Sequence, residues 1–178
     1  IVQASGVSIT QTMATQIYAG IAFDTKLFKF SHPERGLKVC AELVDRGADP
    51  QAIADALFAH QTLETVQTLA SALSTLELHM DGRVSILLVD HAAYGLGGDL
   101  DVVVDHAASI EGVDVALFLK EESPGRYRIS LRSRGAFNVN QVARTFGGGG
   151  HEKASGCTIE APLQDVKKRL LHELTQQL

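Results

Sequence analysis

Apolar residues near the start of the chain recur at the spacing of a helix. Met13, Ile17 and Ile21 lie four positions apart, and this period places them on one side of a helix. Pro33 is a residue type that favours a helix start, and Gly47 is one that favours a helix end. The pattern predicts helices over residues 10–21, 33–47, 50–60 and 62–79. The last of these would carry on one face Val66, Leu69, Leu73 and Leu76.

The pattern changes after residue 81. Continuous apolar runs of strand length appear, and the turn-forming residues 123–125 separate two of the later strands, so a hairpin is expected there. The predicted elements are strands over 84–89, 113–119 and 126–133, a helix over 138–146, a strand over 157–160 and a final helix that Pro162 opens. The predicted fold class is therefore α/β, with a mostly helical amino-terminal segment and then a small domain built on a mixed sheet.

Residues 126–133 alternate between two kinds of side chain. On the two-residue period of a strand, one face carries Tyr127, Ile129 and Leu131 and packs on a core. The other face carries Arg126, Arg128, Ser130, Arg132 and, one step beyond the strand, Arg134. Two interpretations are open at this point, which are an ordinary solvated outer face and a binding surface for an anion.

Net charge limits where such a surface can lie. The net charge of −5 would repel a polyanion over the molecule as a whole, so a nucleic-acid site must be local. The balance reverses within residues 126–153, where Glu152 is the only acid. The basic residues of this span are Arg126, Arg128, Arg132, Arg134, Arg144 and Lys153.

Other features of the composition bear on location. No apolar run approaches the roughly 18 residues of a membrane span, and the chain does not open with a secretion signal. We therefore expect a cytoplasmic protein without a membrane partner. The two cysteines, Cys40 and Cys157, fit no metal spacing and are expected to be buried thiols.

A run of glycines follows the basic strand. Residues 147–150 are all glycine, so their backbone can adopt positive φ and aim several N–H groups at one anion. His151 adds a donor directly after the run, and the guanidinium of Arg132 can bind a phosphate through two N–H groups. The plainer interpretation is a flexible linker, because glycine runs are common in linkers.

The whole phrase is more specific than the glycines alone. It comprises residues 130–135, 138–140, 146–151 and 154–157, and it resembles the DHH-associated, substrate-binding domain of the DHH-family phosphoesterases. The closest branch is that of the nanoRNases and 3'-phosphoadenosine-5'-phosphate phosphatases. The resemblance is strong over residues 82–178 and weaker toward the start. It implies that substrate phosphate is bound by Arg132, Ser133, Gly148, Gly149, Gly150, His151 and Ser155, with His151 also acting in catalysis.

The resemblance also implies a metal site. The segment 20–25 is similar to the end of the family's metal-binding lobe, in which an Asp is a ligand, and Asp24 matches that position. The family has two divalent ions, typically Mn2+, with Mg2+ as an alternative. Lys26 stands where a glycine often follows. The name-giving Asp-His-His triplet is absent, since the pairs Asp90-His91 and Asp105-His106 lack the second His and are expected to be surface residues.

These matches give a domain division and a function. Residues 1–30 would be a remnant of the metal-binding lobe, 31–80 a helical connector and 81–178 the substrate-binding domain. Since the chain begins at Ile1 and supplies one metal ligand, we expect a fragment that is inactive alone. The complete protein would hydrolyse short oligoribonucleotides and 3'-phosphoadenosine 5'-phosphate, with a homodimer as a further expectation. The alternatives are a phosphodiesterase for linear or cyclic dinucleotides and a non-catalytic nucleic-acid-binding module, like the similar domain of alanyl-tRNA synthetase.

Overall fold

The computed structural model describes residues 6–28, 33–59, 61–94 and 101–176. The chain divides into two compact units, Ile1–Gln61 and Thr62–Leu178. The boundary between the units lies inside the segment predicted as a connector. Within the described ranges, no helix has both the length and the apolar character needed to cross a bilayer.

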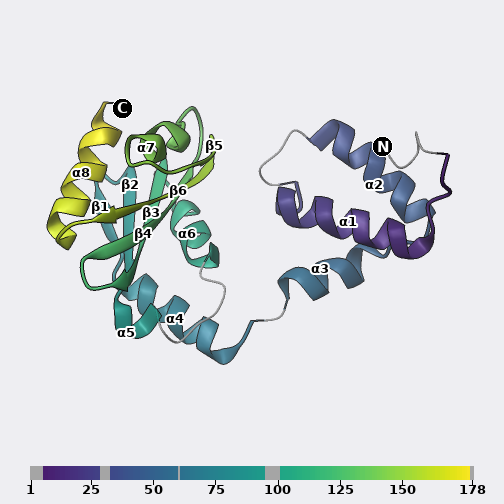
Figure 1. Ribbon diagram of the computed structural model, residues 1–178, viewed down its shortest axis with the longest axis horizontal. Coiled ribbons are helices and arrows are strands. Elements are labelled where there is room, and N and C mark those ends of the chain that lie inside the picture. The colour runs from purple at the N-terminus through teal and green to yellow at the C-terminus, as the bar shows by residue number, and fades with distance from the viewer. Residues whose placement is uncertain (1–5, 29–32, 60, 95–100, 177–178) are drawn as a thin grey trace. The chain divides into compact units, whose positions relative to one another are not determined.

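The first unit contains the helices α1 (Gln11–Thr25), α2 (Pro33–Asp45) and α3 (Pro50–Phe58) (Figure 1). The side chains of Thr10 and Asp49 accept backbone N–H groups at the first turns of α1 and α3, which accounts for where these helices begin. The three helices predicted over 10–21, 33–47 and 50–60 are confirmed, although α1 continues to Thr25 and α2 and α3 end at Asp45 and Phe58. Their shared core consists of Ala14, Tyr18, Ala22, Cys40, Leu43, Ala48 and Ile53.

The second unit is built on a mixed sheet. Its described strands are β1 (Glu77–His79), β2 (Val84–Val89), β3 (Val115–Ser123), β4 (Arg126–Ser133), β5 (Gly149–His151) and β6 (Ala154–Glu160). They lie in the order β1-β2-β3-β4-β6-β5, and β2 and β3 are parallel whereas the other neighbours are antiparallel. The predicted α/β class and the hairpin of β3 and β4 are confirmed. β5 pairs with β6 only at residues 154–156, so no described strand pairs with the outer edge of residues 157–160.

One predicted helix is wrong at its end. The helix α4 spans Leu63–Ser74, and the residues after it form the edge strand β1 instead of continuing the helix to His79. Met80 and Asp81 have φ of 55° and 57°, and this left-handed turn folds β1 back against β2. The sequence pattern misses β1 because its residues are too few and too exposed to show alternation.

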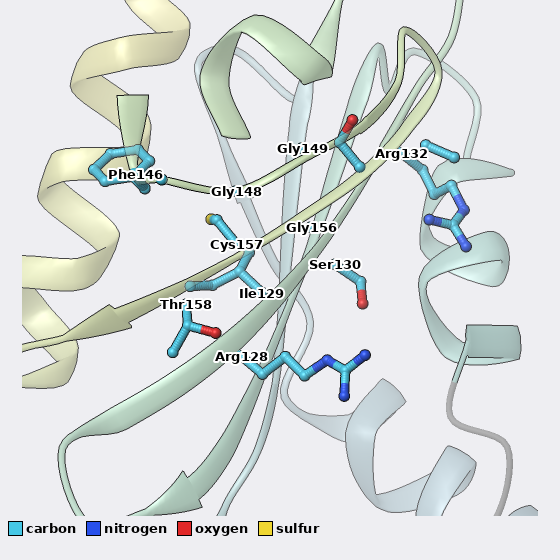
Figure 2. Close-up of a pocket in the computed structure, with 13 residues that line it drawn as sticks. Arg128, Ile129, Ser130, Arg132, Phe146, Gly148, Gly149, Gly156, Cys157 and Thr158 are labelled. Atoms are coloured by element: carbon cyan, nitrogen blue, oxygen red, sulfur yellow. The ribbon is translucent and has the colours of Figure 1, made fainter. Parts of the chain in front are cut away.

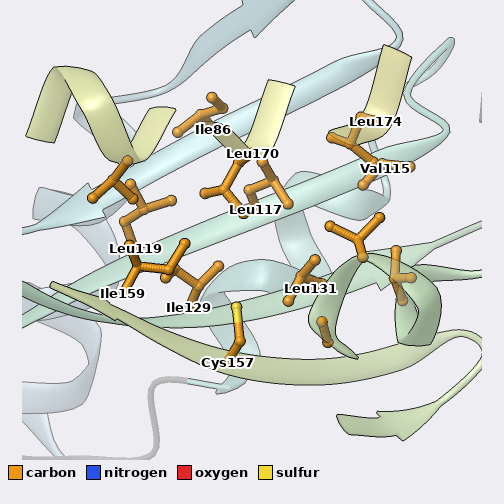
Figure 3. Close-up of a cluster of buried hydrophobic side chains, with 14 of the residues drawn as sticks. Ile86, Val115, Leu117, Leu119, Ile129, Leu131, Cys157, Ile159, Leu170 and Leu174 are labelled. Carbon is orange, nitrogen blue, oxygen red and sulfur yellow. The ribbon is translucent and has the colours of Figure 1, made fainter. Parts of the chain in front are cut away.

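Two helices cover one face of the sheet, α7 (Val139–Thr145) and α8 (Leu163–Thr175). Figure 1 shows α8 and α6 (Asp101–Ala108) on opposite faces. In the core beneath α8, Leu170 and Leu174 pack with strand residues such as Leu117 (Figure 3). The predicted helices over 138–146 and after Pro162 are confirmed, and α7 begins where the Asn138 side chain accepts the N–H of Asn140, at 3.1 Å.

The other face has two halves of different character. The covered half lies on β2 and β3, where Leu87 and Phe118 are buried together with residues of α4 and α6. The short helix α5 (His91–Tyr94) also contacts β3. The open half is the same face of β4 and β6. The strand registers join the halves in one row, since Leu87 lies opposite Phe118, Phe118 opposite Ser130, and Ser130 opposite Gly156.

Candidate functional site

A pocket of about 710 Å³ lies on the open half of the sheet (Figure 2). Its walls come from β4, β6 and the segment that links α7 to β5. The lining residues are Arg128, Ile129, Ser130, Arg132, Phe146, Gly147, Gly148, Gly149, Ala154, Ser155, Gly156, Cys157 and Thr158. The fold therefore brings the basic strand and part of the glycine run into one site, although they lie far apart along the chain.

Arg132 lines this pocket and is anchored to the helix α6. Its Nε donates to Oδ1 of Asp105 at 3.1 Å, and its Nη1 donates to the carbonyl of Leu131 at 3.2 Å. The two charged side chains are 11% and 20% exposed. A guanidinium has five N–H donors, so three remain for a ligand. Asp105 was predicted as a surface residue, and that is wrong because α6 packs across β4 and brings its carboxylate to Arg132.

The other arginines of β4 differ in their partners. Arg126 is exposed and forms ion pairs with Glu122, at 3.3 Å, and with Glu160. Arg128 lines the pocket, and no carboxylate in the described ranges pairs with it. The predicted basic face of this strand is confirmed, but its charges are neutralised to different extents.

The first two glycines of the run end the helix α7. The N–H of Gly147 donates to Arg144 O at 3.0 Å, and that of Gly148 donates to Ala143 O at 2.9 Å. With φ of +72° at Gly147, this is the Schellman arrangement that commonly closes a helix. These two amides are therefore occupied by the helix end and are not free to bind a phosphate.

Two glycines of the run, Gly148 and Gly150, allow the backbone to approach β6 closely. A Cβ on Gly148 would lie 2.1 Å from the carbonyl oxygen of Gly156, and one on Gly150 would lie 2.6 Å from that of Ala154. Gly149 differs, since a Cβ there would meet only the Asn140 side chain, at 4.0 Å. The run is thus an ordered strand with its neighbouring turn, and Gly149 is the position where backbone faces open space beside the pocket.

The remaining residues implied by the resemblance lie in several places. Ser133 is buried and donates to Phe137 O at 2.8 Å, so its hydroxyl fixes the following loop and does not line the pocket. Ser155 does line the pocket, but its hydroxyl donates to His151 O at 2.7 Å. His151 is exposed at the end of β5, outside the lining, as is Gly150. The structure therefore brings together Arg132, Gly148, Gly149 and Ser155 but not Ser133, Gly150 or His151.

Asp24 belongs to the first unit, in the last turn of α1, where it is exposed. Within the described ranges, no three His, Cys, Asp or Glu side chains come together as a metal site would require. Asp90, His91 and His106 are exposed, as predicted. The described residues thus do not form a two-ion centre by themselves.

The thiols and the pocket lining show what chemistry the second unit offers. Cys157 and Cys40 are buried, as predicted, and burial raises the pKa of the Cys157 thiol to about 11, so it is no nucleophile near neutral pH. The pocket lining contains no carboxylate and no imidazole. Guanidinium groups, hydroxyls and glycine backbone are suited to binding an anion, not to activating water.

Comparison with known proteins agrees with this description. The DHHA1 domain model matches residues 85–178, more than half of the chain. The bifunctional oligoribonuclease and PAP phosphatase NrnA of Thermus thermophilus is 32% identical over 178 residues, covering 97% of this chain and 53% of the relative. The cyclic-di-AMP phosphodiesterase PdeA of Listeria monocytogenes is 25% identical over 160 residues, covering 89% of this chain and 24% of the relative.

A solved structure extends the likeness to the fold. The crystal structure of an exopolyphosphatase-related protein from Bacteroides fragilis has a TM-score of 0.84 and 26% identity, covering 94% of this chain and 51% of that chain. The present chain thus spans about half the length of this protein and of the Thermus relative. The activities of those whole proteins can therefore be assigned to this chain only by inference.

Proposed function

Because the chain belongs to the DHHA1 domain family, within the DHH-family phosphoesterases, we propose that it is the substrate-binding part of a phosphoesterase that hydrolyses short oligoribonucleotides and 3'-phosphoadenosine 5'-phosphate. The observation that carries the proposal is the pocket on the open half, in which Arg132 and Gly149 face the same space. Its lining holds two arginines and no acid, so the local charge favours an anion although the chain as a whole is acidic.

In this proposal Arg132 is the principal phosphate ligand. Asp105 fixes the direction of the guanidinium, and the three N–H donors that it leaves free bind phosphate oxygens. Gly149 lets the phosphate approach the backbone closely, and Ser155 fixes the strand β5 through His151. The role of His151 in catalysis stays a proposal, since its side chain lies outside the pocket lining.

The metal chemistry belongs to the complete protein. The resemblance assigns Asp24 to a centre of two Mn2+ ions, or Mg2+, and such ions would lower the pKa of a bound water. One exposed carboxylate does not fix two ions, and the described residues group no further ligands around it. We therefore propose binding without turnover for the 178-residue chain. Manganese-dependent release of nucleotide by the purified chain, abolished by a chelator, would contradict this.

Calorimetry with AMP tests the phosphate site. We expect Arg132→Ala to weaken binding by roughly 1.5–3 kcal/mol, because a charge-assisted hydrogen bond is lost. Arg134→Ala is the matched control, since Arg134 is exposed and lies outside the pocket. His151→Ala is expected to weaken binding less, given its position. Equal affinity of the wild type and both site variants would mean that phosphate binds elsewhere.

Substrate length and form are further parts of the proposal. We expect the complete protein to prefer strands of a few nucleotides, because residues 126–153 carry six basic residues and one acid in a chain whose net charge is −5. Faster cleavage of RNA of about 24 nucleotides than of a dinucleotide would contradict this. The similarity to a cyclic-di-AMP phosphodiesterase favours cyclic dinucleotides as the second candidate. Competition between linear and cyclic diadenylate in the binding assay separates the two.

A further inference from the structure

The two arginines of the pocket differ in how far their charges are neutralised. Asp105 pairs with Arg132, whereas no carboxylate in the described ranges pairs with Arg128. An unneutralised guanidinium in a pocket that otherwise presents hydroxyls and backbone favours an anionic ligand.

A serine hydroxyl lies between the two arginines on the same strand. Ser130 lines the pocket and is 9% exposed, and in the part of the chain that the structure describes its Oγ has no hydrogen bond to another protein group. Figure 2 shows this hydroxyl on the same side of β4 as the Arg128 side chain. This hydroxyl is therefore available to donate a hydrogen bond to a ligand in the pocket, or to accept one from it.

The neighbouring strand leaves room beside this hydroxyl and adds another one. Gly156 lies opposite Ser130 and has no side chain, so the pocket remains open above the sheet there. Thr158 lies opposite Arg128 and also lines the pocket. Arg128, Ser130 and Thr158 therefore provide one guanidinium and two hydroxyls around the same space, which is a set of groups suited to a phosphate.

From this arrangement we propose that Arg128, Ser130 and Thr158 form a second phosphate subsite, so that the pocket binds two phosphates of one nucleotide ligand. Residues 128 and 132 are four apart on a strand, which places their Cα atoms roughly 13 Å from each other. Figure 2 shows the Arg132 guanidinium turned toward α6, where Asp105 anchors it, so it does not serve the Arg128 end of the pocket. The proposal rests on the proposed function and narrows its substrates to ligands with two separate phosphates.

The test compares ligands with one and with two phosphates. AMP and the 5'-phosphorylated diadenylate pApA are titrated calorimetrically into the full chain and into Arg128→Ala. We expect the variant to bind pApA about tenfold more weakly or worse, and AMP within about threefold of the wild type. The affinity for pApA should also become less dependent on salt, because one fewer phosphate is neutralised. Arg128→Lys keeps the positive charge but not the planar group of N–H donors. We therefore expect its affinity for pApA to lie between those of the wild type and Arg128→Ala.

Arg126→Ala is the matched control for this test. Arg126 lies on the same face of the same strand, but its charge is paired with Glu122 and Glu160 and it lies outside the pocket. The control should bind both ligands like the wild type, and thermal melts should show that all variants are folded.

Each outcome bears on the two-phosphate idea. If Arg128→Ala binds pApA with wild-type affinity, the second subsite is overturned. If the variant loses equal affinity for AMP and for pApA, one phosphate contacts both arginines, and the second subsite is overturned as well. In both cases weaker AMP binding by Arg132→Ala would leave the proposed function standing. If the wild-type chain binds neither ligand, the proposed function fails together with the subsite.

Discussion

The covered and the open halves of one sheet face belong to the same hydrogen-bonded sheet, but the first forms part of the core and the second forms a pocket. Along the row from Leu87 through Phe118 to Ser130 and Gly156, the side chains change from large and apolar to small and polar at the step from β3 to β4. The helices α4 and α6 cover the first part, and the pocket lies over the second. The comparison teaches that strand pairing sets the backbone positions of both halves. Side-chain size and polarity then decide which half is covered by helices and which stays open as a pocket.

The largest effect is expected in the covered half. Phe118 is fully buried against α6, so Phe118→Ala should lower the free energy of unfolding by about 3–5 kcal/mol through lost burial and the cavity left behind. Arg128→Ala on the open half should change it by less than about 0.5 kcal/mol, because that side chain is exposed. Urea unfolding followed by circular dichroism measures both. Similar losses for the two variants would mean that the halves do not differ in their contribution to stability.

Next in size is the close approach of strands at the edge of the open half. Gly148→Ala places a Cβ 2.1 Å from a backbone carbonyl oxygen, so we expect a loss of about 1–3 kcal/mol or more. Gly149→Ala is the matched control, because its Cβ would meet nothing closer than 4.0 Å. The same unfolding experiment applies. Equal tolerance of the two alanines would show that β5 moves freely, as a linker would.

A smaller effect is expected from the core beneath the open half. Burial raises the pKa of the Cys157 thiol from its ordinary value of 9.0 to about 11. The unfolded chain therefore loses this proton first, and stability falls as the pH rises from 9 toward 11. Burial and a hydrogen bond to Glu121 likewise raise the pKa of Tyr127 from 10.0 to about 12. The loss of stability therefore continues as the pH rises from 10 toward 12. Thermal melts from pH 8 upward should show a fall that Cys157→Ala reduces, and an unchanged fall in that variant would mean that the thiol is hydrated.

The smallest expected effect is the coupling between the halves through Asp105 and Arg132. Both side chains are partly shielded from water, so a double-mutant cycle with alanine should give a coupling free energy of about 1 kcal/mol. The pair of Arg126 and Glu160 is the control, since side chains that are 47% and 68% exposed should couple only weakly. If the coupling is the same for the two pairs, Asp105 does not anchor Arg132 in solution.

The sequence predicted features that depend on local patterns. The alternation in residues 126–133 placed Tyr127 and Ile129 in the core and the arginines on the other face, and the structure confirms this. Helices with strong caps, such as the one that begins after Asp49, were also predicted. Each of these signals lies within a few residues along the chain, which is the range over which periodicity and capping act.

The features that sequence reasoning missed depend on contacts between distant residues. Asp105 and Arg132 lie 27 positions apart, and no pattern in either segment indicates that they pair. The amide of Gly148 was expected to face a ligand, but its use in ending α7 is visible only once the helix and the strand β5 are placed. The short strand β1 depends on positive φ at two successive residues, Met80 and Asp81, and methionine seldom adopts it.

The pairing of β5 with residues 154–156 also limits how an extended chain can add to this edge of the sheet. An unpaired strand edge is a template on which another polypeptide can add as the next strand, and in long flat sheets this leads to aggregation. On β6 the outer edge without a described partner covers only residues 157–160, carries the charged Glu160 and is followed by Pro162, which has no N–H to donate. An added strand would therefore gain only a few backbone hydrogen bonds, too few to recruit copy after copy into a growing fibre.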